Sequence, residues 1–106
     1  MTKTLNDHRA QHVHLSRSPQ DGKRFVAEFP DKKVHFGSSA GQAFVDHKDL
    51  KIRSAWLARH RVNADFADYR TAGALARWIL WEKPTLAGAV RHLNQKQSEY
   101  RFVLRG

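Results

Sequence analysis

The stretch TAGALARWILWEKPT, from Thr71 to Thr85, places two tryptophans three residues apart in an almost continuous apolar segment. Thr71 is a typical N-cap residue and Pro84 disfavours helix, so the stretch predicts a helix between them. Within AGALARWILWE, residues 72–82, only Arg77 and Glu82 are charged, and a helix that is apolar nearly all round is usually buried. We therefore assign Trp78 and Trp81 to the core. The alternative is an exposed indole that serves as a stacking platform.

The sequence on both sides of this stretch predicts two more helices. Downstream, Thr85 is a candidate N-cap for a helix whose apolar residues recur at i, i+3, i+4 and i+7, namely Leu86, Ala89, Val90 and Leu93. Upstream, the segment 48–62 has helical composition, and Asp49 is well placed as its N-terminal cap. The closing segment 100–105 alternates in polarity as a strand does.

The N-terminal half is typical of short strands joined by turns. Strands are predicted over 12–18, 24–30 and 32–37, and Asp21-Gly22 is a hairpin dipeptide. A small, polar loop with a short turn of helix follows Gly37. Three short strands with tight turns predict an antiparallel meander.

These elements predict an α+β fold: a small antiparallel β-meander over 11–37, three helices from about 49 to 97, and a C-terminal strand at 100–105 that can rejoin the sheet. Residues 1–10 are polar, and we expect a flexible tail there. Residues 11–106 then form a single domain.

The bulk composition limits the possible functions. The 106 residues contain no cysteine, which excludes disulfides and thiolate metal sites, and no apolar run is long enough to span a membrane. The N-terminus does not resemble a signal peptide, and we expect an intracellular or virion-interior protein. The net charge of +9 predicts a polyanionic partner. Nucleic acid is the first expectation, and an acidic protein surface is the second.

Basic residues crowd the predicted helix over 48–62, and two more precede the third strand. Side chains of this type bind phosphate or carboxylate groups. The alternative is a solvated helix whose cations pair with the surrounding acids Asp46, Asp49, Asp65 and Asp68. We predict that nucleic-acid phosphates contact Lys32, Lys33, Lys48, Lys51, Arg53, Arg59 and Arg61.

Signals for catalysis or metal binding are weak. His12, His14 and His35 could converge on one sheet face to bind zinc, but histidines that bind no metal are favoured, and we expect no metal or cofactor. No Walker loop, dinucleotide-binding glycine pattern or catalytic triad spacing is present. A small nuclease that uses His47 and His60 is a third hypothesis, behind non-enzymatic binding.

Five short pieces occur in the order KVHFG, HKD, RHR, TAG and RWILWEKPTL. As an ordered set, over about Lys33 to Leu93, they resemble a family of small uncharacterised basic proteins of large DNA viruses of algae and protists. The resemblance implies a viral origin and a similar fold, but no activity or catalytic residue. It favours a nucleoprotein or virion component, with a minor capsid protein as the alternative. Where that pattern has Asn before KPT, this chain has Glu82.

Overall fold

A computed structural model describes residues 10–105 of the chain, so nearly all of the tail expected at 1–10 lies outside the described residues. The strands and helices follow one another in the predicted order. They are β2 (Gln11–Arg17), β3 (Lys23–Glu28), β4 (Lys33–Ser38), α1 (Phe44–His47), α2 (Leu50–His60), α3 (Ala72–Leu75), the π-helix η1 (Ala76–Leu80), α4 (Leu86–Lys96) and β5 (Tyr100–Leu104).

The four strands form one mixed sheet in the order β4-β3-β2-β5. The antiparallel pairs β2–β3 and β3–β4 confirm the predicted meander. The C-terminal strand joins the other side of β2 in parallel, with Val13 opposite Phe102. Parallel neighbours need a long crossover, and the helical segment supplies it. The α+β prediction is confirmed.

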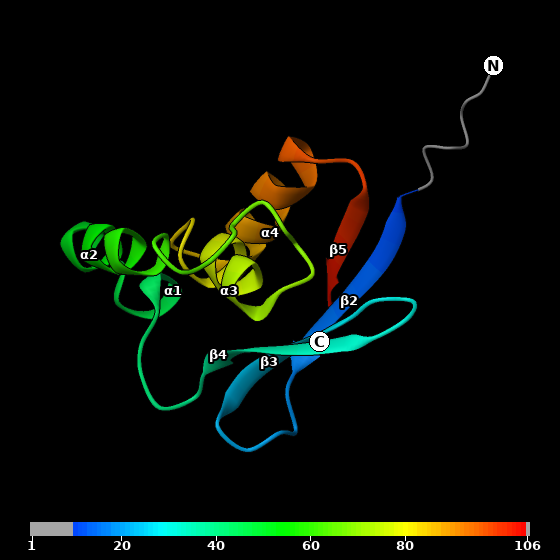
Figure 1. Ribbon diagram of the computed structural model, residues 1–106, viewed down its shortest axis with the longest axis horizontal. Helices are drawn as coiled ribbons and strands as arrows, with labels where there is room; N and C mark the ends of the chain where they lie inside the picture. The colour runs from blue at the N-terminus through cyan, green and yellow to red at the C-terminus, as the bar shows by residue number, and fades with distance from the viewer. Residues whose placement is uncertain (1–9, 106) are drawn as a thin grey trace.

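The helices gather on one side of the sheet, as Figure 1 shows. Side chains of a strand alternate between its two faces, so every second residue points toward the helices. Val13 and Leu15 of β2 are buried there, together with Phe36 of β4 and Phe102 of β5. His12 and His14 alternate with them and point to the opposite face, which no described helix covers.

The tryptophan stretch begins as predicted and ends differently. The Thr71 hydroxyl accepts a hydrogen bond from the Ala74 amide and caps α3. The helix then widens to a π-helix, in which the Trp81 amide donates to the Ala76 carbonyl oxygen at 3.2 Å, and it ends at Leu80. The prediction that Pro84 ends this helix is therefore wrong by one turn.

The residue after the helix end contacts a distant segment of the chain. Just beyond the helix end, the Trp81 carbonyl oxygen accepts a hydrogen bond from Arg53 Nε at 2.7 Å. A π turn adds one residue to a helical turn and often marks a functional site. Here it turns the Trp81 backbone toward α2.

The two tryptophans differ in burial. Trp81 is only 6% exposed and belongs to the core, as predicted. Trp78 is half-buried at the margin of the core, and its Nε1 donates to the Phe66 carbonyl oxygen at 2.7 Å. Arg77 and Lys96 place their charges over its ring, at 4.0 and 4.4 Å from the ring centroid.

The edge strand β5 is protected by two amide side chains. Asn94 donates to the Phe102 carbonyl oxygen and accepts from the Phe102 amide, at 2.9 and 2.8 Å. Gln97 makes the same pair of bonds to Tyr100. These contacts satisfy backbone groups that would otherwise be open to pairing with another strand.

Gly37 of β4 lies where the sheet packs closely against η1. Its φ is +80°, and a Cβ there would lie 2.7 Å from Leu80 Cδ1, whereas Gly22 has a φ of +81° with open space around it. Gly37→Ala should therefore combine backbone strain with overpacking and lower the free energy of unfolding by roughly 2–5 kcal/mol. Gly22→Ala should show strain alone, about 1–2 kcal/mol. Urea denaturation of both variants checks this, and equal losses would contradict the close packing.

Candidate functional site

Helix α2 projects from the body of the protein and presents most of its surface to solvent (Figure 1). Within the described chain none of its residues is fully buried, and Leu50 and Ile52 are 69% and 47% exposed. The Asp49 carboxylate accepts hydrogen bonds from the Lys51 and Ile52 amides, so the predicted cap is confirmed. Because α2 buries so little surface, a few specific contacts must hold it.

The first of these contacts is a stack of aromatic rings. Trp56 of α2 stacks on Trp81 with ring centroids 4.6 Å apart and planes 9° apart. On the same indole, His60 stacks at 4.0 Å and 15°. Two rings cannot both overlap one face of an indole at these distances, so His60 and Trp81 cover its opposite faces. The outward side of His60 is the exposed end of this stack.

The second contact is an ionic one through Arg53. Its Nε donates to the Trp81 carbonyl oxygen, and its Nη2 donates to Glu82 Oε1 at 3.1 Å. The same carboxylate oxygen accepts a 2.6 Å bond from Arg77, and His92 lies 3.4 Å from the other oxygen. Glu82 therefore connects α2, η1 and α4.

The charges around Glu82 lower the pKa of its carboxyl group. Burial raises the pKa of this carboxyl, but the hydrogen bond from Arg77 and the charges of Arg77 and Arg53 outweigh burial, so the pKa lies below its ordinary value of 4.5. The carboxylate stays charged at neutral pH.

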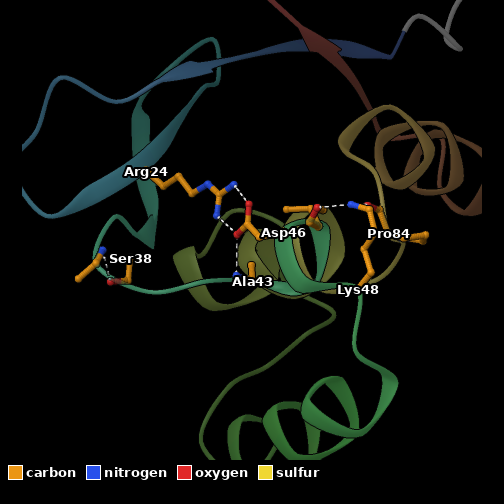
Figure 2. A network of polar contacts seen from close by, with 8 residues as sticks. Arg24, Ser38, Ala43, Asp46, Lys48 and Pro84 are labelled. Carbon is orange, nitrogen blue, oxygen red and sulfur yellow. Dashed lines mark hydrogen bonds and ion pairs between the residues drawn. The ribbon is translucent and has the colours of Figure 1, made fainter.

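A third set of contacts fixes the short helix α1, which leads into α2 (Figure 2). Both guanidinium NH2 groups of Arg24 bind Asp46, whose carboxylate also accepts from the Ala43 amide. The hydrogen bond from Arg24 contributes most to lowering the pKa of Asp46 to about 2. Lys48 has a positive φ of 58°, and its Nζ donates to the Val45 and Pro84 carbonyl oxygens.

An open groove of about 640 Å³ separates α2 from the adjoining strand ends. The α2 wall consists of Ile52, Trp56, Arg59 and His60. The other lining residues come from the strand ends and the loop before α1, among them Lys23 and glycines 22, 37 and 41, and from α3 and η1. The groove therefore combines aromatic rings and cations with accessible backbone.

The structure divides the seven predicted contact residues into three groups. Lys51, Arg59 and Arg61 are exposed on α2 and at its C-terminal end. Lys48 and Arg53 direct their charged groups to partners within the protein. Lys32 and Lys33 lie at the other end of β4, where five residues of strand span about 17 Å from Lys33 to the groove end at Ser38.

Two basic residues of the groove are not among the predicted contacts. His60 belongs to the basic residues of the predicted helix and to the nuclease hypothesis, and the sequence gives no reason to select Lys23. The Asp21-Gly22 turn is a signal that could have placed Lys23 at the start of a strand. Nothing in the sequence shows that this turn lies beside α2.

The histidines do not form the constellations considered from sequence. His47 and His60 are separated by the two stacked indoles, and His47 Nδ1 accepts from the Asp49 amide, so the two imidazoles do not face one reacting atom. His35 lies on β4, two strands from His12 and His14, and binds Ser18 Oγ at 2.7 Å. Across residues 10–105 no three histidine or acidic side chains are placed to hold a metal ion.

Among the described residues, no helix is long and apolar enough to cross a membrane. The longest helices, α2 and α4, have 11 residues each.

Comparison with known proteins gives a match to one family model. Residues 13–60 match the sequence model of a family described as a family of unknown function (DUF5754). The matched segment runs from β2 to the last residue of α2, so it contains the meander, α1 and the basic helix. No curated protein and no solved structure matches the chain.

The Glu82 contacts predict a dependence of stability on pH. The pKa of Glu82 is lower in the folded than in the unfolded chain, so its contribution is fully present above about pH 4.5 and is lost as the pH falls through the lower folded value. Glu82→Gln should lower the free energy of unfolding at pH 7 by about 1–3 kcal/mol, because two half-buried arginines lose their charged partner. It should also flatten the acid dependence.

Urea denaturation at several pH values between 7 and 3 measures both effects. The exposed Glu99 provides the control, because Glu99→Gln should leave stability nearly unchanged at pH 7. A Glu82→Gln protein as stable as the wild type at pH 7 would show that this network does not hold α2.

Proposed function

We propose that the protein binds nucleic acid without catalysing a reaction on it, and that exposed cations of α2 contact the phosphates. The observation that carries this proposal is the distribution of acids around α2. Within residues 10–105 no ion pair joins Lys51, Arg59 or Arg61 to a carboxylate. These cations remain available to an external anion.

The nearby acids bind groups other than these three side chains. Asp46 binds Arg24, and Asp49 caps α2. Asp65 and Asp68 accept hydrogen bonds from the backbone amides of Ala67 and Arg70. Among the described residues, none of these four acids forms an ion pair with a cation of α2, and Arg53 pairs with Glu82 instead.

The net charge also favours binding to nucleic acid. A surplus of nine positive charges on 106 residues attracts polyanions over a distance, and local contacts with phosphates then release counterions. The proposal assigns the local contacts to Lys51, Arg59 and Arg61. Lys32 and Lys33 would contribute to binding only if the nucleic acid were long enough to extend along the β3–β4 hairpin. The resemblance to viral proteins extends the proposal to a nucleoprotein or virion component.

One observation favours a second candidate function, docking on an acidic protein such as a capsid component. Leu50, Ile52 and Val62 are 69%, 47% and 77% exposed at or beside α2. Apolar side chains among cations suit a protein surface better than a sugar-phosphate backbone. Binding of this kind depends on one partner and responds less steeply to salt.

Binding of labelled duplex DNA, single-stranded DNA and RNA across a salt series, followed by fluorescence polarisation, tests the proposal. Affinity should fall linearly on a log–log plot, and the triple variant Lys51→Ala/Arg59→Ala/Arg61→Ala should reduce the slope by about 0.9 per lost contact on duplex and about 0.7 on a single strand. These substitutions remove exposed side chains, so the fold should be retained.

The matched control is Arg17→Ala/Arg91→Ala/Arg101→Ala, which removes the same charge from exposed residues away from α2. It should weaken binding only through the general attraction and leave most of the slope. Equal effects of the two triple variants would reject α2 as the interface. Absence of binding at low salt by the folded protein would reject nucleic acid as the partner.

A further inference from the structure

We propose that the groove beside α2 is a site for single-stranded nucleic acid, in which one base stacks on the outward face of His60 while adjacent phosphates contact Arg59 and Lys23. This inference rests on the proposed function and makes it more specific, because it names the form of nucleic acid and the side chain that reads it.

The first argument is that His60 is held ready to stack. A backbone oxygen can only accept, so His60 Nδ1 donates to the Trp56 carbonyl oxygen, at 2.9 Å. The indole of Trp56 supports the inner face of the imidazole, and Trp81 in turn supports Trp56. A ring fixed on one side by a hydrogen bond and a stack loses little freedom when a base covers its other side.

The second argument is that, among the residues described, His60 forms the exposed end of the stack. Both faces of the Trp56 indole are already covered, and Trp81 is 6% exposed. His60 is exposed and belongs to the groove wall. Base stacking on aromatic side chains is the usual means by which proteins bind single strands without reading their sequence.

The third argument concerns charge and shape. Arg59 lies next to His60 on the groove wall, and Lys23 lies on the opposite wall, so cations flank the stacking position. Glycines on that wall let the backbone approach a ligand closely. The groove volume of about 640 Å³ falls within the range of small-molecule sites and suits one or two nucleotides, whereas a duplex keeps its bases stacked inside.

The test compares a 12-nucleotide single strand with a 12-base-pair duplex at one salt concentration, by fluorescence polarisation. His60→Ala should weaken single-strand binding by roughly 5- to 150-fold, the range for loss of one stacked base, and should change duplex binding little. His60→Phe keeps an aromatic ring and should retain single-strand binding. Both substitutions are at an exposed position, so circular dichroism should show an intact fold.

A second variant tests the groove independently of His60. A Cβ on Gly41 meets no atom within 4 Å, so the position accepts a side chain, and Gly41→Leu adds bulk to the groove wall. It should weaken single-strand binding at least as much as His60→Ala does.

The outcomes separate this inference from the proposed function. If His60→Ala and Gly41→Leu leave single-strand binding unchanged while the α2 triple variant abolishes it, the stacking site is rejected and phosphate binding by α2 stands. If His60→Ala lowers single-strand and duplex binding equally, base stacking is rejected as well. If no nucleic acid binds the folded protein, both proposals fail.

Discussion

The position of the exposed helix α2 depends on one interaction, the stacking of Trp56 on Trp81. Helix α2 contributes no fully buried residue within the described chain, so it cannot be held by a broad apolar face. It is held instead by the stack and by Arg53, which reaches the Trp81 carbonyl oxygen and Glu82. The π turn of η1 presents Trp81 to both contacts.

This attachment explains why a helix rich in cations remains largely exposed. An aromatic pair contributes roughly 0.5–1.5 kcal/mol beyond the area that it buries, and a charge-assisted hydrogen bond about 1.5–3 kcal/mol, so a few such contacts can fix a short helix. The remaining surface of α2 is then not needed to hold the helix in place. Lys51, Arg59 and His60 lie on that surface, and the acids nearest to them are bound elsewhere.

Local sequence signals predicted the fold well because they act over a few residues. The capping hydroxyls of Thr71 and Thr85 and the carboxylate of Asp49 each bind helix amides, and the apolar stripe of α4 is buried at Ala89, Val90 and Leu93. The strands differ from their predicted bounds by one or two residues.

The contacts between distant segments could not be predicted in the same way. Arg53 binds the Trp81 carbonyl oxygen, 28 residues away in the chain, and a local helical pattern does not predict that contact. For the same reason, the predicted contact surface joined Lys32 and Lys33 to the cations of α2. The direction of β4 instead places these two lysines at the other end of the hairpin. The β2–β3 turn brings Lys23 to the groove in their place.

Chemical-shift mapping tests the central claim most directly, because it reports where nucleic acid touches the protein as well as whether it binds. A ¹⁵N-labelled sample titrated at low salt with a short single-stranded oligonucleotide should show its largest shifts at the Arg59 and His60 amides, at Lys23 and at the Trp56 indole N–H. Shifts concentrated instead on the uncovered sheet face, around His12, His14 and Arg101, would contradict the account.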